Sequence, residues 1–147
     1  MAKQNNTDMM IQMFAKDHHN VDPGMNRRLQ IVDVLFSCFP SEAPVLMQSV
    51  LDYREKIHDT EEQFRLLRIR YEGDNYAFNQ RWAQVDKTRS IYHNAAIKAA
   101  AALNGYCDQL HIDHLFVSDT SESSGARTVI GEEMIALAEA ITEEETR

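Results

Sequence analysis

The sequence predicts an all-α helical bundle built on a long antiparallel helix hairpin, with shorter helices flanking it. Its 147 residues include only 5 Gly and 3 Pro, and β-branched runs are short, so few strands are expected. In two long segments the apolar side chains recur every three or four residues, as they do on a helix that buries one face. A chain of this length favours one domain over residues 1–147.

The first long segment is expected to form a helix over residues 42–71. Ser41 precedes it in the position of an N-cap, and Pro44 is compatible with a first helical turn. The apolar stripe of this segment has the heptad spacing of paired helices. It consists of Ala43, Leu46, Val50, Tyr53, Ile57, Thr60, Phe64, Leu67 and Tyr71.

The second long segment is expected to be helical over residues 75–110. Gly73 marks the turn before it, and Asp74 or Asn75 is expected to cap it. Gly105 is an alternative end, because Gly suits the left-handed conformation that closes many helices. The stripe nevertheless continues past it, through Phe78, Trp82, Val85, Arg89, Tyr92, Ala96, Ala99, Leu103, Tyr106 and Leu110.

Shorter elements flank the hairpin on its N-terminal side. Residues 1–24 read as an N-terminal arm that contains a helix over 8–15, with Met10, Met13 and Phe14 on one face. Residues 16–24 have the Asn, Asp, Pro and Gly of a linker, and a further helix is expected over 25–39.

The C-terminal part is expected to be a loop followed by an acidic helix. Residues 113–127 are rich in Ser, Thr and Gly, which favours the loop. Thr128 is the expected cap of a helix over 128–144. Its apolar face comprises Ile130, Met134, Leu137 and Ile141.

The formal net charge of −8 is concentrated at the C-terminal end. Residues 108–147 hold 2 Lys and Arg against 10 Asp and Glu, while the residues before them are close to neutral. This balance argues against a nucleic-acid partner, and the acidic end is either a solvated face or a docking surface for a basic partner. A cytoplasmic chain without a membrane segment is expected, because there is no apolar leader and Cys38 and Cys107 imply no disulfide framework. Uncovered apolar flanks favour a homodimer, with a protein partner as a further possibility.

One polar group interrupts the apolar stripes. Arg89 stands where Leu or Ala is expected, and a turn centred near Gly73 places it opposite His58. Residues three and four apart on a helix are neighbours, so further polar side chains are expected near this pair. The predicted cluster comprises Glu55, His58 and Glu62 from one helix and Asp86, Arg89, His93 and Asn94 from the other.

Three functions are compatible with this cluster. A structural ion pair that fixes helix register suits a non-enzymatic interaction or structural module, which we favour because no catalytic motif is complete. A metal-independent, ribonuclease-like enzyme is the alternative, with Arg89 stabilising phosphoryl charge and His93 transferring a proton. A metal site is the second alternative, since Glu55-x-x-His58 has the spacing of di-iron bundles, but Asp108-x-x-His111 lies too far away to complete it. No cofactor is expected.

The second long segment carries a resemblance. Its residues Asp86, Arg89, His93, Asn94 and Ile97, followed by Leu103-Asn104, are similar to a motif of a small bacterial all-helical family of unknown function. The resemblance covers about a quarter of the chain, and Gly105 stands where that family has a basic residue. It implies a helical fold and brings no activity with it.

Overall fold

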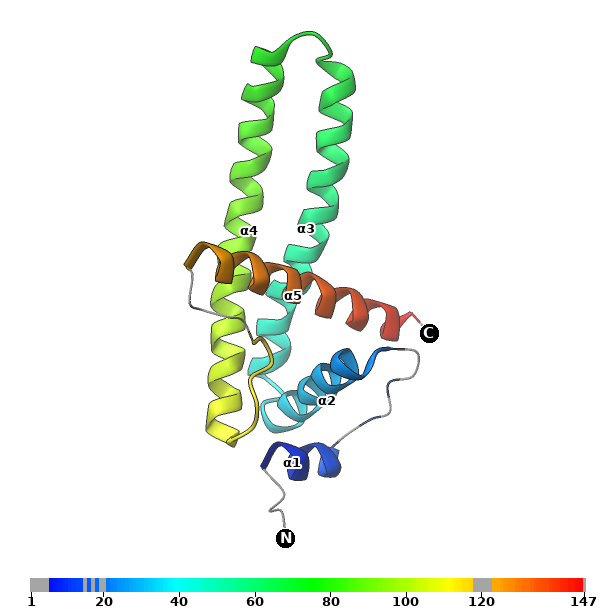
Figure 1. Ribbon diagram of the computed structural model, residues 1–147, viewed down its shortest axis with the longest axis vertical. Helices are drawn as coiled ribbons and strands as arrows, with labels where there is room; N and C mark the ends of the chain where they lie inside the picture. The colour runs from blue at the N-terminus through cyan, green and yellow to red at the C-terminus, as the bar shows by residue number, and fades with distance from the viewer. Residues whose placement is uncertain (1–5, 15, 17, 19–20, 118–122, 147) are drawn as a thin grey trace.

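The computed structural model describes residues 6–14, 16, 18, 21–117 and 123–146, and it leaves the side chains of residues 6 and 123–130 undescribed. These residues form five α-helices and no strand, which confirms the predicted fold class. The helices α3 and α4 make the long hairpin, and the shorter helices lie around its lower half (Figure 1). Their bounds are α1 Asn6–Phe14, α2 Pro23–Cys38, α3 Glu42–Arg70, α4 Asn75–Leu110 and α5 Ser123–Glu145.

The hairpin begins and ends close to its predicted bounds. Gly73 takes a φ of 82° in the turn, a conformation that a residue without a Cβ adopts readily. Asp74 caps α4, because its side-chain oxygen accepts a hydrogen bond from the backbone N–H of Ala77 at 3.1 Å. Ser41 is the N-cap residue of α3, as predicted, but it has helical backbone angles and its side chain makes no capping bond.

The alternative end of α4 at Gly105 is wrong. The helix continues to Leu110 and closes at His111, whose φ of 59° is left-handed. Asn104 therefore lies inside the helix, where its side-chain amide donates to the backbone C=O of Phe116 at 2.8 Å and accepts from the N–H of Phe116 at 3.0 Å. This pair of bonds holds the segment after α4 against the helix.

The helix α2 begins two residues earlier than predicted. Asp22 accepts a hydrogen bond from the backbone N–H of Met25 at 2.9 Å, which makes Asp22 the N-cap. Pro23 and Gly24 are consequently in the first turn, where the missing N–H of proline costs no hydrogen bond. The last two residues of the predicted linker, Pro23 and Gly24, therefore belong to the helix, while its other described residues are not helical.

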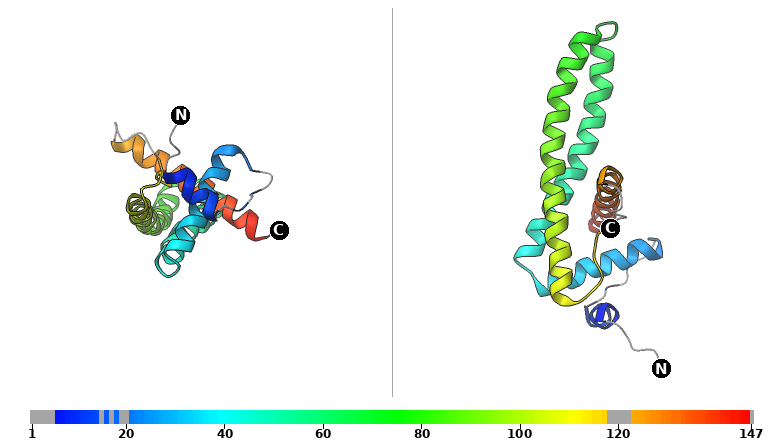
Figure 2. Two further views of the ribbon diagram at one scale, coloured as in Figure 1. Left: turned by 90° about the horizontal axis from the view of Figure 1, so that it is seen from below. Right: turned by 60° about the vertical axis from the view of Figure 1, so that its left-hand side comes forward.

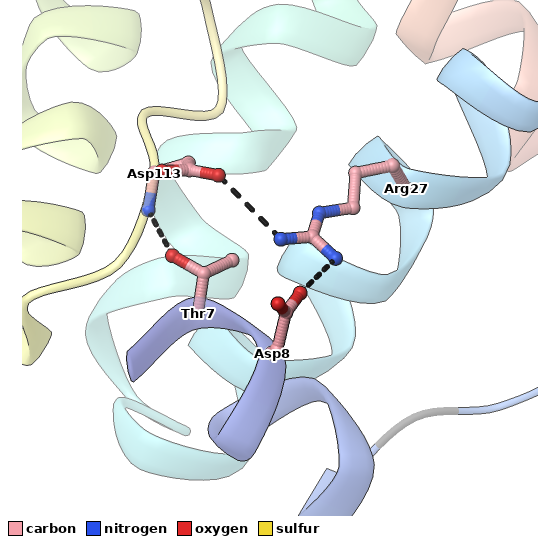
Figure 3. A network of polar contacts seen from close by, with 4 residues as sticks. All are labelled: Thr7, Asp8, Arg27 and Asp113. Carbon is pink, nitrogen blue, oxygen red and sulfur yellow. Dashed lines mark hydrogen bonds and ion pairs between the residues drawn. The ribbon is translucent and has the colours of Figure 1, made fainter. Parts of the chain in front are cut away.

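The helix α1 is tied to the rest of the molecule by polar contacts (Figure 3). The Thr7 hydroxyl accepts from the backbone N–H of Asp113 at 2.7 Å, and Arg27 contacts Asp8 at 2.9 Å and Asp113 at 3.5 Å. The predicted apolar face was partly wrong: Met10 and Phe14 pack against the core, but Met13 is 71% exposed, and the buried apolar residue of α1 is Ile11. The helix is longer at its start than the predicted range.

The helix α5 begins at Ser123, so the predicted loop over 113–127 is too long and Thr128 lies inside the helix instead of capping it. Both views of the ribbon show α5 crossing the hairpin on the same side as α2 (Figure 2). Met134 and Leu137 are fully buried and Ile141 packs against the core, as predicted, while the side chain of Ile130 lies outside the described residues.

The core occupies the lower half of the molecule, where all five helices contribute. It includes Leu35, Met47, Leu103 and Leu137, none of them solvent-exposed. Cys107 is also buried there, and burial raises its pKa to about 11, so this thiol stays protonated at neutral pH. None of the described helices combines the length and apolar character that crossing a bilayer requires.

The upper half of the hairpin stands clear of the other helices (Figures 1 and 2). We call residues 59–92 the arm; they lie between His58, which bonds Glu139 of α5, and His93, which Gly131 of α5 approaches. All residues of the arm are described, and Thr60 alone among them is buried. An aromatic cluster joins its two helices: the Phe64 ring lies 5.6 Å from Phe78 and 5.0 Å from Trp82, and Arg68 lies over Phe64.

The stability of the arm is expected to depend on this aromatic cluster. Trp82→Ala removes the ring that contacts both phenylalanines, and we expect the local free energy of opening to fall by about 1–2 kcal/mol, less than a fully buried tryptophan loses. Amide hydrogen exchange measures the effect, with faster exchange in residues 59–92 and unchanged exchange in α2. Tyr76→Ala, at a side chain that is 74% exposed, is the control. Equal effects of the two variants contradict this account.

Candidate functional site

The two hairpin helices pair in the register that a turn at Gly73 predicts. The ring of Tyr53 lies 5.1 Å from that of His93, and the ammonium of Lys56 lies 4.9 Å from the centre of the Tyr92 ring. The first pair lies where α5 crosses the hairpin, and the second lies at the base of the arm. Polar and aromatic side chains thus gather at the border between arm and body.

Arg89 lies in this region, but it is not enclosed and its observed partner is not His58. Its Nε and terminal nitrogen donate to one oxygen of Asp86 at 3.0 and 2.8 Å, and the side chain is 32% exposed. Side chains of a helix lean toward its N-terminus, so Asp86, one turn earlier, is within direct reach. Arg89 therefore forms a half-exposed pair within α4, rather than an ion pair across the seam.

The other predicted members of the cluster separate into different contacts. His58 bonds Glu139 of α5 at 3.3 Å, and Glu62 bonds Arg65 on its own helix at 2.6 Å. The hydrogen bond from Arg65 lowers the pKa of Glu62. Glu55 lines a groove on the hairpin surface, and Asn94 is exposed. The seven predicted residues consequently all lie in the middle part of the hairpin, but their side chains take different partners and do not form one site.

Two residues at the crossing were not predicted as site residues. Tyr53 is 5% exposed, and burial raises its pKa, while the charge of Arg89 and a hydrogen bond with it act in the opposite direction. Gly131 of α5 passes directly over this tyrosine: a Cβ at Gly131 would lie 3.6 Å from the Tyr53 hydroxyl and 3.7 Å from Nε2 of His93. Tyr53 thus joins α3 to Arg89 and His93 of α4, and α5 covers the junction.

Carboxylates and histidines do not converge on a metal site in the part of the chain that the structure describes. No group of three or more His, Cys, Asp or Glu side chains there has the geometry to hold a metal ion. Of the two half-motifs, His58 bonds Glu139, and Asp108 bonds His114 at 2.7 Å. These contacts are hydrogen bonds between pairs of side chains, with no third ligand beside either pair in the described residues.

An open groove of about 390 Å³ lies at the base of the arm. Asp52, Glu55, Lys56, Asp59 and Tyr92 line it. Lys56 lies between Tyr92 and Asp59, whose carboxylate is 3.5 Å from its ammonium. With three carboxylates and one ammonium, the groove is acidic and favours a cationic group from outside the chain.

The arm surface beyond the groove is rich in large apolar side chains. Of ten exposed large apolar residues in the described chain, six belong to the arm: Phe64, Leu66, Ile69, Tyr76, Ile91 and Tyr92. The arm also carries four arginines between residues 63 and 85 and no lysine there. Aromatic residues and Arg are enriched in protein interfaces, and Lys is depleted.

Comparison with known proteins adds no relative to this description. No protein-family model matches the chain, and neither curated proteins nor solved structures match it. The chain is thus defined by its own architecture, an all-α body from which a two-helix arm projects. The resemblance of residues 86–104 to a bacterial helical family stays a prediction.

The close approach of α5 to Tyr53 gives a stability prediction. A methyl group at Gly131 has ordinary van der Waals distances to its neighbours, and alanine is the better helix former, so we expect Gly131→Ala to raise the free energy of unfolding by about 0.5–1 kcal/mol. Chemical denaturation measures it. The larger side chain of Gly131→Leu must displace Tyr53 or His93 and is expected to lower stability. A destabilising Gly131→Ala contradicts the described spacing.

A pH prediction concerns Glu133 of α5, which contacts Arg28 at 2.8 Å. Burial raises the pKa of Glu133, and Arg28 only partly offsets this effect. The folded state therefore holds the proton more tightly than the unfolded state, so ionisation of Glu133 costs stability above its folded pKa. Glu133→Gln removes that cost, and we expect the variant to unfold at higher denaturant concentration than the parent at pH 7. Its advantage should shrink as the pH falls through the raised pKa toward the ordinary value. An advantage that does not change with pH contradicts this account.

Proposed function

We propose that the protein is a non-enzymatic interaction module that presents its projecting arm to another macromolecule. The observation that carries the proposal is the arm itself: residues 59–92 extend beyond the shared core and expose more than half of the large apolar side chains found on the described surface. The fully buried large side chains all lie outside this extension.

The composition of the arm supports a protein partner. Arg68 lies over the rings of Phe64 and Phe78, at 5.7 and 5.8 Å, and beside it a groove of about 370 Å³ includes Ile69 and Tyr71. Arginine held on aromatic rings next to apolar side chains is the composition of the energetically dominant part of many interfaces. The arm is rigidly displayed by two helices, which lowers the entropy cost of binding.

An acid–base enzyme is the second candidate. The observation that favours it is that two basic residues approach Tyr53: the charge and hydrogen bond of Arg89 lower its pKa, and the ring of His93 lies against its ring. Against it, Asp86 already pairs with Arg89, and neither Arg89 nor His93 lines the groove at the base of the arm or the groove beside Arg68. The interaction module is therefore the better supported function.

The interaction proposal is tested by site-specific photo-crosslinking in the cells that make the protein. Benzoylphenylalanine replaces Ile69 or Ile91 in the arm, and Met13 of the body is the control position because it is also more than 60% exposed. We expect a discrete crosslinked product from both arm positions and none from Met13. Arm positions that give no product, or the same products as Met13, contradict the proposed function.

A further inference from the structure

The helix α3 carries a second heptad stripe beside the one that faces α4. The stripe packed on α4 includes Tyr53, Ile57, Thr60, Phe64, Leu67 and Tyr71. Moving back by one residue gives another series with alternating spacings of four and three: Asp52, Lys56, Asp59, Gln63, Leu66 and Arg70. A shift of one residue is about 100° around a helix, so the second stripe runs along the flank of α3.

This second stripe is accessible. Asp59 and Arg70 are exposed, Leu66 is 46% exposed, and the acidic groove at the base of the arm is lined by the first three residues of the stripe. On α3 His58 bonds Glu139 of α5, and His58 lies about a third of a turn away from Asp52 around the helix. The ribbon views place α2 and α5 together on one side of the hairpin (Figure 2).

The charges of α3 are divided along its length. Residues 52–62 contain five carboxylates and two basic side chains, whereas residues 63–70 contain three arginines and no carboxylate. A parallel neighbour of the same sequence therefore sets the acidic part of one helix beside the acidic part of the other, whereas an antiparallel neighbour sets the acidic part of one helix beside the arginine-rich part of the other.

Resting on the proposed function of the arm, we propose that the partner is a second copy of this chain, bound antiparallel along the second stripe of α3. A two-fold axis beside residue 61 brings Asp52 of each copy to Arg70 of the other. The same axis sets Asp59 against Gln63, and the aliphatic stem of Lys56 against Leu66. Every residue of the stripe then meets a complementary one, and the contact is the same on both subunits, as two-fold symmetry requires.

The acidic groove receives the incoming arginine in this arrangement. The partner's guanidinium enters beside Asp52, with Asp59 and the Tyr92 ring nearby. Carboxylates and an aromatic face are both favourable surroundings for a guanidinium, which supplies the cationic group that the groove lacks. The overlap of the two α3 helices runs from residue 52 to residue 70, about 27 Å of helix, and this limited length predicts a weak, concentration-dependent dimer.

A charge exchange tests the pairing. Asp52→Arg places two arginines together at both ends of the dimer, and Arg70→Asp places two aspartates together, so each variant alone is expected to sediment as a monomer at concentrations where the parent protein is a dimer. An equimolar mixture of the two variants has opposite charges at both ends, and we expect it to regain the dimer. The double variant D52R/R70D is also expected to dimerise.

Two controls match these charge changes elsewhere. Lys87→Asp, on the far side of α4, and Glu143→Arg, near the end of α5, are expected to leave the dimer unchanged. Helix content measured by circular dichroism checks folding, and recovery on mixing shows directly that both single variants are folded. A parent protein that stays monomeric at its highest soluble concentration overturns the proposal, and so does a mixture that fails to recover the dimer.

The self-association and the proposed function can be tested separately. Crosslinks from the arm to a second copy of the chain support both proposals. Crosslinks from the arm to a different protein, together with a monomeric parent, retain the interaction module and overturn the self-association.

Discussion

The seam between α3 and α4 is the constraint on which the whole structure depends. In the body this seam is covered by α2 and α5, so its residues reach full burial, as Val50 and Leu103 do. In the arm the two helices pack on each other along the same seam, and a pair of helices has too little surface to enclose a core. Arginines of the arm consequently take partners one turn away on their own helix: Arg65 pairs with Glu62, and Arg89 with Asp86.

The crossing of α5 sets the border between these two regions. At this point the space above Tyr53 and His93 has room for no more than a small side chain, because a Cβ at Gly131 would already be in van der Waals contact with both. Further along, Glu139 of the same helix bonds His58. The acidic C-terminal helix thus lies across the hairpin and leaves the arginine-rich half of α3 outside its reach. The acidic residues that are concentrated at the C-terminal end of the chain therefore lie in the body, whereas the arginines of residues 63–70 lie in the arm.

Local chemistry explains which features could be predicted from the sequence. The hairpin bounds depend on Gly73, Asp74 and the apolar spacing, and these are visible in the sequence. The start of α5 lacks such a signal, since Thr128 resembles a cap but lies inside the helix. The placement of His58 depends on Glu139, 81 residues away, and no local pattern contains that information. Tyr53 was assigned to the apolar stripe correctly, and its contact with Arg89 followed only from the full geometry.

The two stripes of α3 differ in their exposure to water, and this difference explains their compositions. The stripe facing α4 is covered by that helix whenever the chain is folded, so apolar side chains are favourable there. A stripe that is solvated in the free chain and covered in a complex cannot be equally apolar, because an exposed apolar face of that length associates without specificity. Charged ends with one exposed leucine meet both requirements: water solvates them when the chain is alone, and opposite charges determine the direction of a partner when it binds. Such a stripe determines the direction in which a partner helix binds more than it determines how tightly that helix binds.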